Sequence, residues 1–62
     1  MYKKIENLLK QRNITPYRLS KDTGIPYTSL HDWKTGRSKP KIDKLVILAN
    51  YFNVPIDYFV DG

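Results

Sequence analysis

The chain has 62 residues, of which 40% are hydrophobic, and its 11 Lys and Arg outnumber its 6 Asp and Glu to give a net charge of +5. A chain of this length forms one small domain, residues 1–62, with little room for a substrate pocket, and the lack of cysteine and the single histidine exclude a disulfide framework and a structural zinc site. Its longest apolar run, Leu45–Ala49, is far shorter than the ~20 residues of a membrane helix, and the N-terminus lacks the apolar stretch of a signal peptide, so we expect a cytoplasmic protein without membrane contact, cofactor or metal.

The first predicted element is an amphipathic helix at the N-terminus. Its apolar side chains recur every three or four residues, at Tyr2, Ile5, Leu8 and Leu9. Lysines and asparagine occupy the opposite side of the same helical wheel. This pattern predicts a helix of about three turns that ends by Asn13.

Thr15 followed by Pro16 predicts the start of a second helix. The threonine hydroxyl can accept a free backbone N–H, and proline loses no hydrogen bond at the first helical position. The helix is expected to run to about Thr23, with Leu19 and Thr23 facing inward. Gly24 then supplies the turn, because glycine tolerates left-handed backbone.

The third predicted helix follows the dipeptide Ile25-Pro26. Proline forces the preceding residue into extended backbone, so Ile25 belongs to the turn and the helix begins near Pro26. Leu30 and Trp33 are three residues apart and mark its buried side, which places the indole ring in the core. Gly36 ends this helix.

The fourth helix is predicted to be the most apolar one, with a wide buried stripe: Ile42, Leu45, Val46, Leu48, Ala49 and Phe52. Asn53 is a plausible terminator, and Pro55 restarts a short helix that carries Ile56, Tyr58 and Phe59. No segment alternates convincingly with the period of a strand. The chain is therefore predicted to be all-α, with five short helices.

Basic residues are concentrated between Lys34 and Lys44, around the connector between the third and fourth predicted helices. These cations, opposed only by Asp43, are Lys34, Arg37, Lys39, Lys41 and Lys44. On charge alone this segment is either a solvated loop or a contact for a polyanion.

Residues 16–35 form the informative unit: a helix, a glycine turn and a second helix in about twenty residues. Its small and apolar anchors are Leu19, Ser20, Gly24, Leu30 and Trp33. This unit resembles the helix-turn-helix of phage-repressor and Cro-like (XRE-type) transcription regulators. The resemblance extends to the pattern Leu45-x-x-Leu48-Ala49-x-x-Phe52-x-Val54-Pro55-x-Asp57-x-Phe59. It implies a lambda-repressor-like DNA-binding domain with the helix-turn-helix at its second and third helices.

The resemblance implies that the outer side of the third helix reads bases through Tyr27, Thr28, His31 and Asp32. Thr28 can hydrogen-bond or touch a thymine methyl, and Asp32 can accept from cytosine N4. His31 can donate to a purine acceptor, and Tyr27 offers a ring or a hydroxyl. The alternative for each is an exposed surface residue, and for Asp32 also a group that repels wrong sites. Pro26 stands where the family often has a small hydroxyl residue.

The resemblance also assigns phosphate contacts to the start of the second helix and to the turn after the third. The residues are Pro16, Tyr17, Arg18, Thr35, Arg37, Ser38 and Lys39. Because Pro16 has no N–H, its neighbours must supply the backbone donor. Arg12 is a further side-chain candidate, whereas Lys3, Lys4 and Lys10 are expected on a solvated face.

The function that the resemblance implies is sequence-specific binding to a double-stranded DNA operator by a transcriptional regulator, most simply a repressor that occludes a promoter. Family members usually dimerise, so we expect a homodimer through the fifth helix and the C-terminus. The candidate residues are Ile56, Tyr58 and Val60, whose alternative role is core closure, the role expected for Phe59. Whether the chain is a whole regulator or a piece of one stays open.

A protein-interaction module or antitoxin-type adaptor on the same fold is the alternative. Pro26 and Asp32 on the groove-facing helix favour it, whereas the net charge of +5 argues for DNA. An enzyme is not expected, because the adjacent His31 and Asp32 diverge on a helix and no third group completes a site.

Overall fold

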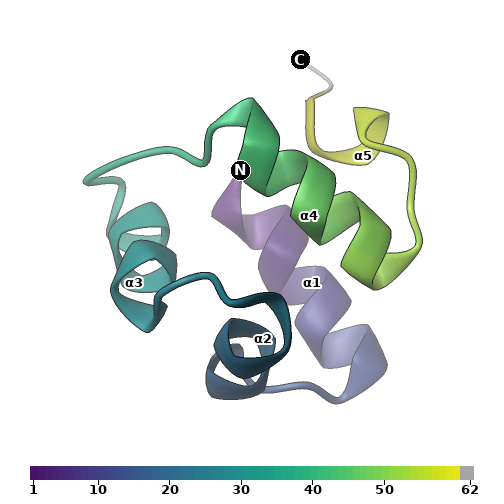
Figure 1. Ribbon diagram of the computed structural model, residues 1–62, viewed down its shortest axis with the longest axis horizontal. Coiled ribbons are helices and arrows are strands. Elements are labelled where there is room, and N and C mark those ends of the chain that lie inside the picture. Colours follow the sequence, from purple (N-terminus) through teal and green to yellow (C-terminus); the bar gives the residue numbers. More distant parts are fainter. Residues whose placement is uncertain (61–62) are drawn as a thin grey trace.

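The computed structural model describes residues 1–60. Its helices are α1 (Tyr2–Arg12), α2 (Pro16–Thr23), α3 (Tyr27–Thr35), α4 (Ile42–Phe52) and α5 (Asp57–Val60). These residues contain no strand, so the predicted all-α class with five helices is confirmed. Figure 1 shows α1 and α4 in the middle of the molecule, with α3 and α5 at opposite edges. Within this described part, no helix is long and apolar enough to cross a membrane.

The first four helices each end on a residue with left-handed backbone. These residues are Asn13, Gly24, Gly36 and Asn53, with φ between 57° and 82°. Glycine and asparagine are the residue types that adopt this conformation at low cost. All four predicted helix ends are therefore confirmed, and each end is set by its own terminal residue.

The start of α2 is also the predicted one. The Thr15 hydroxyl accepts the backbone N–H of Arg18 at 3.1 Å, and Pro16 occupies the first helical position. α3 begins differently, because Pro26 precedes it and supplies no side-chain cap. The Pro26 carbonyl instead accepts the backbone N–H of Ser29 at 2.9 Å.

Side chains of α2 hold the turn between α2 and α3. Ser20 donates its hydroxyl to the Ile25 carbonyl at 2.6 Å, and Thr23 donates to the Leu19 carbonyl at 2.7 Å. Ile25 is almost fully buried, which its assignment to the turn did not anticipate. Thr23, predicted to face inward, is only half-buried. The turn is thus fixed both by hydrogen bonds and by an isoleucine anchored in the core.

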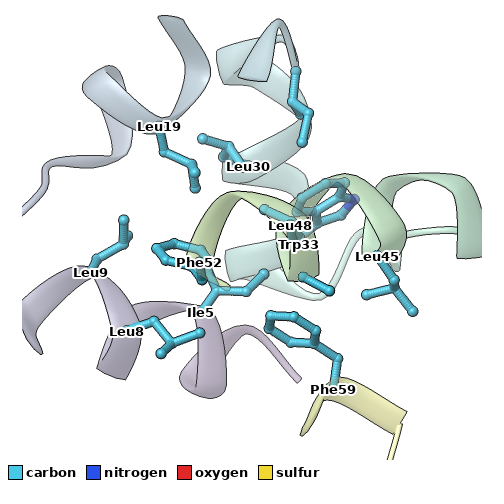
Figure 2. Packing of buried hydrophobic residues seen from close by; sticks show 12 residues of the cluster. Ile5, Leu8, Leu9, Leu19, Leu30, Trp33, Leu45, Leu48, Phe52 and Phe59 are labelled. Atoms are coloured by element: carbon cyan, nitrogen blue, oxygen red, sulfur yellow. The ribbon is translucent and has the colours of Figure 1, made fainter. Parts of the chain in front are cut away.

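Every helix contributes to one hydrophobic core, whose side chains converge in Figure 2. Its buried members are Ile5, Leu8, Leu9, Leu19, Ile25, Leu30, Trp33, Leu45, Leu48, Ala49, Phe52 and Phe59. The predicted core positions of Trp33 and Phe59 are confirmed. Ile56 and Tyr58 pack against this core while remaining half-buried.

The buried stripe of α4 is narrower than predicted. Ile42 is 63% exposed and Val46 is 44% exposed, so their predicted burial is wrong. They follow each other on one ridge of the helix, beside the face that carries Leu45 and Leu48. Because a domain this small covers α4 on one face only, the neighbouring ridge remains in contact with solvent.

Two polar contacts tie distant helices together. Arg12 donates from Nη2 to the Phe52 carbonyl at 2.7 Å, which caps the end of α4 from the end of α1. Tyr51 of α4 donates its hydroxyl to the Asp22 carboxylate of α2 at 2.6 Å. Arg12, a candidate for phosphate contact, is therefore engaged within the fold in this structure.

Candidate nucleic-acid interface

The outer side of α3 carries the four predicted base-reading residues. Tyr27, Thr28 and His31 are exposed, and Asp32 is half-buried. Leu30 and Trp33 fill the opposite side of the same helix and hold it against the core. The structure therefore presents these four residues on one helix at the edge of the molecule.

The end of α3 is braced by its own backbone. The Asp32 carbonyl accepts the backbone N–H of Arg37 at 2.9 Å and that of Ser38 at 3.3 Å, and it also accepts the Thr35 hydroxyl at 3.2 Å. These bonds fold the first residues of the basic loop back over the end of α3. Thr35 and the following loop residues through Lys39 are all exposed. The predicted phosphate contacts of this turn thus lie beside the predicted base readers.

The start of α2 lies next to α3 as well. Pro16 lines a small notch together with Tyr27 and His31. Thr15 caps the Arg18 N–H and Pro16 has none, so Tyr17 is the residue of this first turn whose N–H has no bond among the described residues. A free N–H at the positive end of a helix is a suitable donor to an anion.

Arg18 is placed apart from these residues. Its Nε donates to the Asp22 carboxylate at 2.9 Å, and the same carboxylate oxygen accepts the Tyr51 hydroxyl. This flank of α2 faces α4, whereas Ser20 and Pro16 face the turn and α3. Arg18 remains well exposed, and its Nε is engaged by Asp22.

Three side chains have shifted pKa values: Asp22 and Tyr51 where α2 meets α4, and Tyr2 beside α3. The hydrogen bond from Tyr51, assisted by Arg18, holds the pKa of Asp22 below its usual value. That same hydrogen bond raises the pKa of Tyr51. Burial raises the pKa of Tyr2, with smaller contributions from Glu6 and Tyr27. Tyr2 therefore stays a neutral hydrogen-bond donor beside α3.

Sequence reasoning missed Tyr2 and Lys34 as part of this surface. Both line the notch that also contains Pro16 and His31. The charge pattern alone places Lys34 only among the basic residues between Lys34 and Lys44. The sequence could have predicted this position of Lys34, because a residue four positions after the buried Leu30 lies on the side of α3 that faces α1.

Comparison with known proteins agrees with this arrangement. A family model described as helix-turn-helix matches residues 5–59. An uncharacterised HTH-type transcriptional regulator of Bacillus subtilis (strain 168), YobD, is 33% identical over 57 residues, which cover 92% of this chain and 51% of that protein. The HTH-type transcriptional activator BcrR of Enterococcus faecalis is 25% identical over 59 residues, which cover 95% of this chain and 29% of that protein. The chain thus spans about half or less of the length of these relatives. No solved structure gives a significant match.

Proposed function

Because the chain belongs to the helix-turn-helix family of DNA-binding transcription regulators, we propose that it binds double-stranded DNA sequence-specifically, with α3 in the major groove. The observation that supports this most is the exposed outer side of α3, flanked by the basic loop and by the start of α2. The major groove of B-DNA, roughly 12 Å wide, admits one α-helix. α3 has nine residues, and Tyr27, Thr28 and His31 on its outer side are exposed to a groove of this width.

Base reading falls to the four outer residues of α3. Thr28 lies in the first turn and can meet a thymine methyl or a base edge, and Asp32 lies one turn later and can accept from cytosine N4. His31 and Tyr27 border the notch toward α1 and offer donors to a purine or a phosphate. Each good base contact discriminates by about 1–3 kcal/mol.

Phosphate contacts frame this helix on both sides. On one side Tyr17 offers its backbone N–H, with Pro16 packed beside it. On the other side lie four exposed polar or basic residues: Thr35, Arg37, Ser38 and Lys39. Arg18 uses its Nε for Asp22, which leaves its two Nη groups for a phosphate at the edge of the site. These contacts position the protein without reading sequence.

A homodimer through the C-terminal helix completes the proposal. Val60 of α5 is 50% exposed, and Ile56 and Tyr58 are half-buried beside it; residues 61–62 lie outside the described part of the chain. α5 and α3 lie at opposite edges of a molecule about 25 Å across (Figure 1). Successive half-sites of an operator lie about one DNA turn, roughly 34 Å, apart, and this is the spacing that two α3 helices of such a dimer have to match.

The simplest regulatory outcome is repression by occluding a promoter. One relative is named a transcriptional activator. A reporter gene under the selected operator therefore has to decide whether this protein represses or activates. A protein-interaction module on the same fold is the second candidate. Three apolar side chains of α4 and α5 favour it, because Ile42, Val46 and Val60 are 63%, 44% and 50% exposed and thus available to a protein partner.

The deciding experiment is a selection of binding sites from random duplex DNA at two salt concentrations. An enriched inverted repeat with half-sites about one turn apart is the expected result. Salt-sensitive retention without a motif would contradict base reading by α3 and leave only phosphate contacts. No retention even at low salt would overturn DNA binding and favour the protein-interaction module.

A further inference from the structure

A groove of about 360 Å³ runs along α1, bordered by the start of α2 and by Lys34 of α3. Its apolar surface comes from Leu9, Ile14 and Pro16, with the ring of Tyr2 at one end. Small-molecule sites in proteins begin at roughly 300 Å³ and are lined mainly by apolar groups, with a few polar groups that fix orientation. By size and lining, the groove therefore fits a small organic molecule.

The charges around this groove favour an anion. Lys10 and Lys34 lie on its rim, Glu6 is its one acidic residue, and neither lysine forms an ion pair within residues 1–60. Thr15 and Pro16, which also line the groove, mark the positive end of α2. Tyr2 adds a neutral hydroxyl that can donate a hydrogen bond. The groove thus has an apolar surface with cationic groups and hydrogen-bond donors at its edges.

We propose that this groove binds a small organic anion, with the negative group at Lys10 and Lys34 and the apolar body on Leu9 and Ile14, and that the bound anion competes with DNA. The binding step stands independently of the function proposed above, and only the competition rests on it. No covalent chemistry is involved.

Competition follows from shared residues. A smaller notch of about 70 Å³ shares Tyr2, Pro16 and Lys34 with the groove and continues to His31 on the outer side of α3. An anion seated at Lys34 neutralises a cation that lines both hollows together with Pro16, the residue before Tyr17, whose backbone N–H is proposed to bind a DNA phosphate. The bound anion and the DNA phosphate then repel each other, so that binding of one weakens binding of the other.

The binding half is tested by titrating the isotope-labelled chain with phenyl phosphate and following its amide resonances. We expect saturable shifts centred on Lys10, Lys34 and Tyr17, with a dissociation constant on the order of 1 mM for so small a probe. Inorganic phosphate tests the charge alone and phenol tests the ring alone. Each is expected to bind at least about tenfold more weakly.

Lysine substitutions localise the site. Lys34→Gln is expected to weaken phenyl phosphate binding about tenfold, whereas Lys3→Gln, which removes an exposed lysine of α1 that does not line the groove, leaves it unchanged. Equal effects of the two substitutions, or equal binding of inorganic phosphate, would overturn the proposal. Since both positions are exposed, neither substitution is expected to unfold the chain.

The competition half uses a fluorescent duplex at constant ionic strength. Phenyl phosphate at about ten times its dissociation constant is expected to raise the apparent dissociation constant for DNA about tenfold, and sodium sulfate adjusted to the same ionic strength is the control. Phenyl phosphate that binds without displacing DNA would contradict the competition. If no duplex binds under any condition, the proposed function fails, while the titration still decides whether the groove is an anion site.

Discussion

Asp22 accepts hydrogen bonds at one carboxylate oxygen from two residues, the Tyr51 hydroxyl at 2.6 Å and Arg18 Nε at 2.9 Å. The pKa of Asp22 is therefore lowered from 3.8, and that of Tyr51 is raised from 10.0. A carboxyl with a lowered pKa stabilises the fold above its unfolded pKa and loses that stabilisation as the pH falls through its folded pKa. A tyrosine with a raised pKa stabilises below its unfolded pKa and loses that stabilisation as the pH rises through its folded pKa.

Tyr51→Phe is therefore expected to lower the free energy of unfolding at neutral pH and to flatten its pH dependence at both ends of the range. The loss of unfolding free energy at low pH becomes smaller but does not disappear, because Arg18 still pairs with Asp22. Urea unfolding between about pH 2 and pH 11 measures this. Tyr17→Phe is the control, since Tyr17 is 63% exposed and its hydroxyl forms no hydrogen bond within residues 1–60. An identical profile for both variants would mean that the Tyr51 hydroxyl contributes nothing to the fold.

Thr28 is the residue at which base reading is tested most directly. Thr28→Ala removes the hydroxyl and the methyl group that can touch a base edge, while the exposed position leaves the core unchanged. We expect specificity to relax at one base position by about 1–3 kcal/mol, without a change in salt dependence. Repeating the site selection with this variant and with Asn7→Ala, an exposed change on α1, checks the result. A motif unchanged by Thr28→Ala would remove Thr28 from the base contacts.

The start of α2 depends on one local contact, because the Thr15 hydroxyl is its side-chain cap. Thr15→Ala leaves the Arg18 N–H without that acceptor and is expected to cost about 1 kcal/mol in the free energy of unfolding. Thr35→Ala is the matched control, since the exposed Thr35 hydroxyl bonds a carbonyl at the end of α3 and caps no helix start. Urea denaturation of both variants measures the difference. Equal losses would show that the cap contributes no more than an ordinary surface hydroxyl.

Local signals explain why the element boundaries could be predicted from the sequence. Thr15-Pro16 starts α2, and Asn13 and Gly24 end helices, through contacts and backbone angles that involve only near neighbours. Burial of Ile42 and Val46 could not be predicted in the same way. It depends on whether another element covers that ridge of α4, and an apolar residue type does not decide this.

The same distinction between local and long-range determinants applies to the candidate site. The outer residues of α3 were predictable because Leu30 and Trp33 fix which side of the helix faces inward. The groove along α1 was not, because it is formed by Tyr2, Ile14 and Lys34 from three separate segments. The hydrogen bond from Tyr51 to Asp22 likewise depends on how α2 packs against α4, over a separation of 29 residues, whereas Arg18 and Asp22 are four residues apart on the same helix. Long-range packing is thus what the sequence left undetermined.

At the scale of the whole molecule, the dimer that we propose through α5 makes a prediction about operator length. Val60→Asp introduces a charge on a 50% exposed side chain and is expected to leave the chain folded while shifting the protein toward monomer. Binding to an inverted repeat should then fall to the affinity for a single half-site. Sedimentation and binding to both operators test this, with Asn7→Asp as a control of equal charge change. Loss of dimer in the control as well would indicate general charge effects.

The net charge of +5 by itself does not say which cations neutralise DNA phosphates, whereas the fold separates two groups. Arg37 and Lys39 lie in the exposed loop after α3, and Lys3 lies on an exposed face of α1 that lines neither hollow. Each phosphate contact contributes about 0.9 to the slope of log K against log salt concentration. Arg37→Ala and Lys39→Ala should therefore each reduce the slope by about that amount and weaken specific and random duplexes alike, whereas Lys3→Ala should change neither. Titrations at about 50 to 200 mM salt measure this, and an unchanged affinity and slope for Arg37→Ala would show that the loop does not contact the phosphates.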